Sequence, residues 1–164
     1  PQGKILAKIY AESDLLLTET IRNGILDELS APELLSVVSC MIFQSRSRDE
    51  YAPKMPHQNV SNALVEIAKL WAKLEDIENE FDVKTQKEPD LGFAYISYRW
   101  AQGNSLTNVL KGSDMSVGDF VRSAKQLMDL LMQIAGASEK LRPVCREAIK
   151  RLDRGVVSYM VDDL

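Results

Sequence analysis

The sequence predicts an all-α protein, folded as a helical bundle of about six or seven helices. Apolar residues recur every three to four positions in segment after segment, and no segment keeps the period-two alternation of a strand. The chain has 164 residues, of which 45% are hydrophobic and 27% are charged, a balance typical of globular proteins. We therefore expect one domain, residues 1–164, with one long amphipathic helix at its centre.

The first clear helix is expected over residues 13–29, with Ser13 or Asp14 as its N-cap. Its apolar residues have helical spacing: Leu16, Leu17, Ile21, Ile25 and Leu29. Gly24 inside this segment costs about 1 kcal/mol relative to alanine, which predicts a kink or close packing there. For residues 3–10, "GKILAKIY", a helix is favoured over a short strand.

The next helix is expected over residues 30–45. Ser30 is a good N-cap, Pro32 suits the first turn, and Glu33 completes a capping box. This segment is apolar nearly all round, so we expect it at the centre of the core. Residues 46–59 contain two prolines and mixed charges, and they are expected to form a long exposed loop.

Three further helices follow from periodicity and from their end signals. Residues 59–81 form a long helix with one apolar side: Val60, Leu64, Ile67, Leu70, Trp71, Leu74 and Ile77. After a loop over 82–90, an aromatic helix is expected over 91–105, ending at Gly103. The last helix is expected over 138–157, with Pro143 in its first turn or at a kink.

Residues 116–135, "SVGDFVRSAKQLMDLLMQIA", form the most regular amphipathic pattern. Ser116 and Asp119 match a helix start. The opposite face carries a polar stripe within an arc of about 120°: Arg122, Lys125, Gln126, Asp129 and Gln133. These side chains suit contacts to phosphate, sugar or base. From the residues alone, a solvated helix face is the simpler interpretation.

The chain shows no arrangement of residues for catalysis. It has neither a GxxxxGK[ST] loop nor a GxGxxG turn, and carboxylate pairs such as those in "LEDIENEF" suit a solvated face. His57, the single histidine, is expected at the surface. Cys40 and Cys145 are expected as buried free thiols of a reducing cytoplasm. We expect no cofactor and no metal in this domain, and no enzyme activity of its own.

Charge and hydropathy limit the possible partners. The net charge of −4 argues against a dedicated free-standing nucleic-acid binder, so any such contact must be local or shared with another domain. Trp71 and Trp100 sit at helical spacing with other apolar groups, which favours core packing over base stacking. No apolar run approaches the ~18 residues of a membrane span, and a cytoplasmic location without membrane contact is expected.

Four blocks of the sequence, taken in this order, resemble one family. They are "SDLLLTETIRNGILDELSAPELLSVVSCMIFQSR", "EPDLGFAYISYRWAQGNSLTNVL", "DMSVGDFVRSAKQLMDLLMQIA" and "AIKRLDRGVVSYMV". The chain is similar to the DSHCT domain, the C-terminal helical domain of superkiller-type DExH-box RNA helicases. The stretch "EPDLGFAYISYRW" most resembles the actinobacterial branch. The chain begins without methionine, so a fragment of something larger or a processed form is expected, and the resemblance implies a C-terminal piece of a larger helicase.

The resemblance implies a helical domain that packs on a two-lobed ATPase core and closes a channel for single-stranded RNA. One long helix of the family, the ratchet helix, lies along the strand, and residues 116–135 match it. The family has an arginine at the position of Gln126 and a carboxylate at Asp129, both facing the RNA. Arg122 matches a basic position one turn earlier. The glutamine at 126 removes a charge but keeps the capacity for a hydrogen bond.

The leading hypothesis is therefore an accessory domain of an ATP-dependent RNA helicase, with ATP and Mg in the motor core of the same parent chain. The expected contacts to single-stranded RNA, with DNA left open, are Arg122, Lys125, Gln126 and Asp129. The alternative is a helical protein-interaction module without nucleic-acid contact, which would use an apolar groove or the aromatic helix 91–105.

Overall fold

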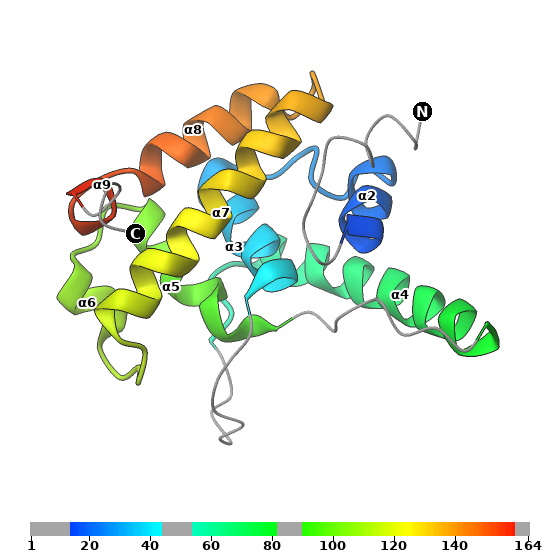
Figure 1. Cartoon of the computed structure of the whole chain (residues 1–164), viewed down its shortest axis with the longest axis horizontal. Helices are drawn as coiled ribbons and strands as arrows, with labels where there is room; N and C mark the ends of the chain where they lie inside the picture. Colours follow the sequence, from blue (N-terminus) through cyan, green and yellow to red (C-terminus); the bar gives the residue numbers. More distant parts are fainter. Residues whose placement is uncertain (1–13, 44–53, 82–89, 160–164) are drawn as a thin grey trace.

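The computed structural model describes residues 14–43, 54–81 and 90–159, and within these ranges it is helical without any strand (Figure 1). The elements are α2 (Asp14–Arg22), α3 (Ala31–Ile42), α4 (Gln58–Glu80), the 3-10 helix η1 (Leu91–Phe93), α5 (Ala94–Ala101), α6 (Leu106–Leu110), α7 (Val117–Ala137), α8 (Arg142–Leu152) and α9 (Val156–Tyr159). The predicted all-α bundle is confirmed. The helix expected over 3–10 lies outside the described residues, as does most of the two expected loops.

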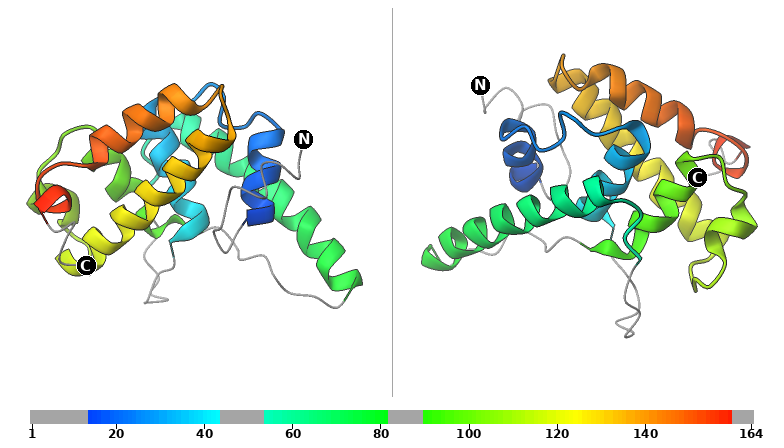
Figure 2. Two further views of the ribbon diagram at one scale, coloured as in Figure 1. Left: turned by 45° about the horizontal axis from the view of Figure 1, so that its top comes forward. Right: turned by 180° about the vertical axis from the view of Figure 1, so that it is seen from behind.

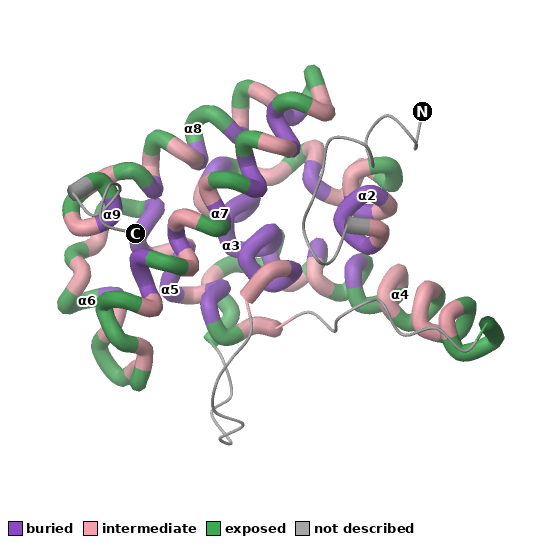
Figure 3. The backbone as a smooth tube through the Cα atoms, viewed as in Figure 1, coloured by how far each residue is buried: buried purple, intermediate pink, exposed green. Residues whose placement is uncertain are grey.

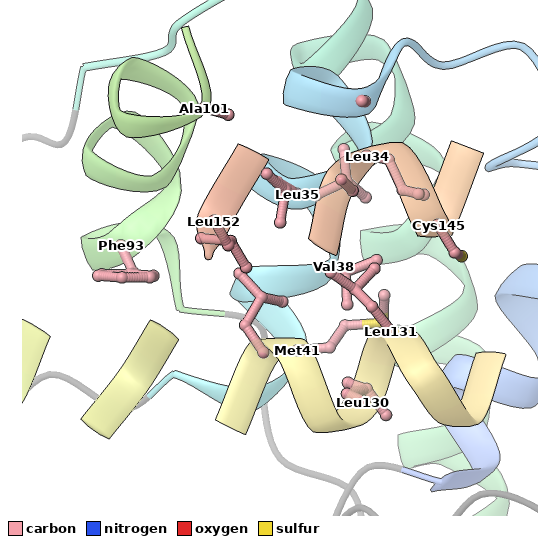
Figure 4. Close-up of a cluster of buried hydrophobic side chains, with 14 of the residues drawn as sticks. Leu34, Leu35, Val38, Met41, Phe93, Ala101, Leu130, Leu131, Cys145 and Leu152 are labelled. Atoms are coloured by element: carbon pink, nitrogen blue, oxygen red, sulfur yellow. The ribbon is translucent and has the colours of Figure 1, made fainter. Parts of the chain in front are cut away.

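Helix α3 forms the centre of the bundle and packs against α4, α5, α7 and α8. Its start is the predicted capping box: the Glu33 amide donates to Ser30 Oγ at 3.4 Å, and the Ser30 amide donates to Glu33 Oε1 at 2.9 Å. Figure 4 shows how side chains of α3, α7 and α8 meet in the core: Leu34, Leu35, Val38, Met41, Leu130, Leu131, Cys145 and Leu152. The helix ends at Ile42, three residues before the predicted end, because Phe43 is extended.

The helix predicted over 13–29 is wrong at its C-terminal end, since α2 stops at Arg22. Gly24 takes a left-handed φ of +72° instead of continuing the helix with a kink. Its amide donates to Ile21 O at 3.1 Å, and the Ile25 amide donates to Thr20 O at 3.3 Å. In these two hydrogen bonds, amides that follow the helix donate to carbonyls of its last turn. The pattern requires a left-handed φ at Gly24, which glycine adopts at little cost.

The prediction of one helix over 138–157 is also wrong, because this segment forms two helices, α8 and α9. Helix α8 begins at Arg142 with Pro143 in its first turn, as expected for proline. It ends at Leu152, and Gly155 then turns the chain into α9 with a φ of +54°. A Cβ atom on Gly155 would lie 3.3 Å from the Trp100 ring, so the α8–α9 turn is packed tightly on α5.

The aromatic segment 91–105 forms η1 and α5, and Gly103 closes it as predicted, with a φ of +97°. Trp100 is 2% exposed, its Nε1 donates to Leu152 O at 3.0 Å, and its ring meets Phe120 edge to face at 5.1 Å. Core packing is thus confirmed for Trp100.

Both cysteines, Cys40 and Cys145, are buried free thiols, as predicted. Burial raises the pKa of both thiols to about 12.

Helix α4 has one apolar side, which is buried at its start, half-buried as far as Leu74 and exposed at its end. Val60, Ala63 and Ile67 are buried against α2 and α3. Further along, Ile77 is 46% exposed and the C-cap residue Phe81 is 71% exposed. Figures 1 and 2 show the outer half of α4 extending past the rest of the bundle. The predicted apolar side exists, and its last turn, with Ile77, faces solvent in the described part of the chain.

Candidate nucleic-acid interface

Helix α7 lies at the surface of the bundle, between the centre formed by α3 and solvent (Figure 3). Its N-cap is Ser116, whose Oγ accepts the Asp119 amide at 3.1 Å. One face is buried in the core: Phe120, Val121, Ala124, Leu127, Leu130, Leu131, Ile134 and Ala135. This burial fixes the rotation of α7 about its axis, so the opposite face is held toward solvent.

The predicted polar stripe is that solvent-facing side. Arg122, Gln126 and Asp129 are exposed, and Lys125 and Gln133 are half-buried. All five fall on one stripe because their spacing of three and four residues matches the helical repeat. The structure therefore brings the four predicted contact residues together on one face. Their contact with nucleic acid stays a prediction.

The stripe carries both signs of charge. Arg122 Nη1 lies 3.1 Å from Asp119 Oδ1, and the two side chains are 57% and 25% exposed. Such a surface pair contributes only about 0.3–0.5 kcal/mol, so Arg122 can exchange it for another anion. The stripe itself carries two cations, Arg122 and Lys125, and one anion, Asp129, and Asp119 beside it adds a second anion. The stripe offers a set of hydrogen-bonding groups to a strand but little net attraction for phosphates.

A second polar cluster joins α3 to α4, and sequence reasoning found only half of it. Glu33 Oε2 accepts from Asn59 Nδ2 at 3.1 Å and lies 3.1 Å from His57 Nδ1. His57 is exposed, as predicted, and it also caps α4 because its Nδ1 accepts the Asn59 amide at 3.0 Å. The capping-box spacing identifies Ser30 and Glu33, whereas His57 is 24 residues away and no local signal points to it.

Hydrogen bonds lower the pKa of the Glu33 carboxyl. Burial alone would raise the pKa of this carboxyl, but the Ser30 amide, the Asn59 and Ser30 side chains and the nearby His57 together lower it below its usual range. The carboxylate in turn adds to burial in raising the pKa of Tyr98, whose ring stacks on His57. These contacts join α3, the start of α4 and α5.

Two arginines close the C-terminal end of α5. Arg154 Nη2 donates to Trp100 O at 2.6 Å and to Asn104 O at 2.8 Å, and its guanidinium lies 3.7 Å from the Trp100 ring centroid. Arg151 Nη1 donates to Ala101 O at 3.0 Å. These donors satisfy carbonyls left over at the end of α5, so both arginines serve the fold.

No other feature of the described residues forms a stronger site. A pocket of about 420 Å³ between α4 and the turn that follows α2 is lined by charges of both signs, and Glu66 there is paired with Lys69 at 3.1 Å. Among residues 14–43, 54–81 and 90–159, no group of three histidine, cysteine or acidic side chains could hold a metal. Within the same ranges, every helix is too short or too polar to cross a membrane.

Comparisons with known proteins agree with the resemblance. The model of one protein family, described as the DSHCT (NUC185) domain, matches residues 1–160. The probable helicase HelY of Mycobacterium tuberculosis is 34% identical over 169 aligned positions, which cover 95% of this chain and 19% of HelY. HelY of Mycobacterium leprae is 36% identical. The human exosome RNA helicase MTR4 is 29% identical over 95% of the chain and 16% of its own length. The chain thus spans less than a fifth of the length of these relatives.

Proposed function

The chain belongs to the DSHCT family, and from this premise we propose that it is an accessory helical domain of an ATP-dependent RNA helicase. In this proposal the chain packs on a motor core of the same parent protein, and α7 lines the path of single-stranded RNA. ATP and Mg are held by that motor core. The relatives named above as helicases support the assignment, since each carries a region similar to this chain.

The observation that carries the proposal is the stripe on α7. Its residues Arg122, Lys125, Gln126 and Asp129 face away from a fully buried side of the same helix. Arginine and lysine bind phosphates, the amide of glutamine bonds to phosphate, sugar or base, and a carboxylate accepts from a 2′-hydroxyl or an exocyclic amine. A helix anchored in this way can hold such groups at fixed positions along a strand.

The small net charge of the stripe defines its role. Since most affinity for nucleic acid comes from phosphate neutralisation, two cations with Asp129 among them and Asp119 beside them bind RNA weakly by themselves. We therefore assign it to guiding a strand that the motor core holds, and to coupling the movement of the core lobes to strand advance. The isolated chain is expected to bind RNA poorly.

The test replaces two residues of the stripe, Gln126 and Asp129, neither of which forms an ion pair with a residue that the structure describes. Gln126→Ala with Asp129→Ala in the full-length helicase should reduce duplex unwinding strongly and affect ATP hydrolysis less. A matched control removes the same two side-chain types elsewhere, with Gln102→Ala and Asp153→Ala, because both are exposed. Unwinding that is unchanged in the first variant, or equally reduced in the control, would refute the assigned role.

Gln126 offers a second test in the opposite direction. The family resemblance places an arginine at this position, so Gln126→Arg adds one cation to the exposed stripe. For single strands, each phosphate contact adds about 0.7 to the slope of log K against log salt. RNA binding by the full-length protein should become tighter and its salt slope steeper by about 0.7. An unchanged slope would show that position 126 does not reach a phosphate.

A second candidate function, a protein-interaction module, is favoured by the outer half of α4. Ile77 and Phe81 are exposed there beside acidic residues. Ile77→Ala with Phe81→Ala should abolish binding of a protein partner if this candidate is correct, and should leave unwinding intact. The parent sequence upstream of residue 1 also discriminates: a GxxxxGK[ST] loop and a DExH box there support the helicase domain.

A further inference from the structure

Charge is distributed unevenly along this chain. The whole protein has a net charge of −4, and α4 carries five acidic and two basic residues. In contrast, residues 138–154, which include α8, carry six basic and three acidic residues, a net charge of +3. The surplus of positive charge on this acidic protein is therefore concentrated on α8 and its immediate flanks.

Three basic residues form one row along α8: Arg142, Arg146 and Lys150. They are spaced by four residues, so they lie on the same flank and about 6 Å apart along the helix axis. Arg142 begins the row half-buried, and its Nε donates to Ala135 O at 2.8 Å. This hydrogen bond ties the start of the row to the last turns of α7.

Arg146 and Lys150 are exposed and form no ion pair with any residue that the structure describes. The acid between them, Glu147, is paired with Arg151 instead, at 3.0 Å. Like charges four residues apart destabilise a helix by about 0.2–0.5 kcal/mol. Lys150 lies in the last turn, where the helix dipole favours a cation, but Arg146 lies in the middle of α8 and gains nothing from the dipole.

The helix that carries the row packs against the helix that carries the stripe. Helices α7 and α8 pack side by side with their chains running in opposite directions, and both are at the surface (Figures 1 and 2). The stripe has a net charge of +1, which Asp119 beside it offsets, whereas residues 138–154 carry a net charge of +3. The two helices thus present complementary features to a polyanion: hydrogen-bonding groups on α7 and free positive charge on α8.

We propose that Arg146 and Lys150, together with Arg142, form a second contact row that binds the backbone phosphates of the single strand guided by α7. This inference rests on the proposed function. Arginine pairs with phosphate oxygens through two parallel hydrogen bonds, and lysine provides a point charge. The row supplies the counterion-release contribution to affinity that the α7 stripe lacks.

The experiment compares two variants of equal charge change in the full-length protein. The test variant is Arg146→Gln with Lys150→Gln. The control is Lys73→Gln with Lys111→Gln, which are exposed lysines on α4 and after α6 and form no ion pair with a described residue. Thermal unfolding by circular dichroism verifies that both variants fold. Binding of a fluorescein-labelled oligouridylate is then measured over a series of salt concentrations.

Loss of two phosphate contacts should reduce the slope of log K against log salt by about 1.4, which corresponds to up to about 25-fold weaker binding at 0.1 M salt. The control should keep the parent slope. A test variant with the parent slope, or a control with the same reduction, overturns the proposal. If the test variant keeps the salt slope of the parent protein but has lowered ATPase activity, the proposal is also overturned. The row would then contact an acidic protein surface and not RNA.

The Gln126→Ala and Asp129→Ala variant separates this inference from the function on which it rests. If unwinding is impaired in that α7 variant while the α8 variant keeps the salt slope of the parent protein, the proposed function stands and the α8 row is refuted. A reduced slope in the α8 variant with normal unwinding in the α7 variant supports the row as a phosphate contact and refutes the role of α7.

Discussion

Glu33 should make the stability of this protein depend on pH in a way that one substitution can isolate. Its carboxylate is 8% exposed. It accepts hydrogen bonds from the Ser30 amide at 2.9 Å and from Asn59 Nδ2 at 3.1 Å, with His57 Nδ1 also 3.1 Å away. Glu33→Gln keeps the shape of the side chain and removes its charge, so it imitates the protonated acid.

The expected loss follows from the bonds that the charge strengthens. A hydrogen bond to a charged group contributes about 1.5–3 kcal/mol, against about 0.5–1.5 kcal/mol for a neutral pair. Glutamine can still accept from the Ser30 amide but presents its NH₂ group toward Asn59 and His57. The free energy of unfolding of Glu33→Gln should therefore fall by about 1–3 kcal/mol at pH 7.

The sign of the pH dependence follows from the lowered pKa of Glu33. A carboxyl with a depressed pKa in the folded state contributes stability above its unfolded pKa, and that contribution disappears as the pH falls through the folded value. The difference between parent and variant should be complete at pH 7. It should begin to shrink near the ordinary carboxyl pKa of about 4.3 and close at lower pH.

Urea unfolding of the 164-residue chain from pH 7 down to pH 3 provides the measurement. Glu66→Gln is the control, since Glu66 is 55% exposed in a surface pair with Lys69 and should change stability by less than about 0.5 kcal/mol. The same stability difference at pH 7 and at pH 3 would show that Glu33 is not held as a carboxylate by these bonds, and the reasoning would be wrong.

Other predictions concern glycines and thiols. Gly155→Ala should lower the midpoint of thermal unfolding, because it imposes a left-handed φ on alanine, at about 1–2 kcal/mol, and places a Cβ 3.3 Å from Trp100. Gly136→Ala should raise it, since this α7 position has open space and alanine favours helix by about 1 kcal/mol; a lower midpoint would contradict the described packing. Cys40 and Cys145, with pKa values of about 12, should resist Ellman's reagent at pH 8 until urea unfolds the chain, and rapid labelling of the native protein would contradict their burial.

Much of the fold was predictable because its signals are local. The capping box of α3, the N-cap Ser116 of α7 and helical spacing identify these two helices from a few neighbouring residues, and Gly103 ends the aromatic segment as glycine is expected to. Two of the wrong helix ends, those of α2 and α8, share one cause. Gly24 and Gly155 adopt positive φ values, and periodicity continues through a glycine whether or not the chain turns there.

The amino-acid sequence by itself determined the all-α class, the amphipathic pattern of α7 and the family, because each depends on residue order alone. Only the tertiary structure decided which charges lack partners. Glu147 pairs with Arg151 rather than Arg146, and Glu33 meets His57 across 24 positions. Such pairings depend on the rotation and packing of whole helices, which burial of their apolar faces fixes and which no spacing along the chain records.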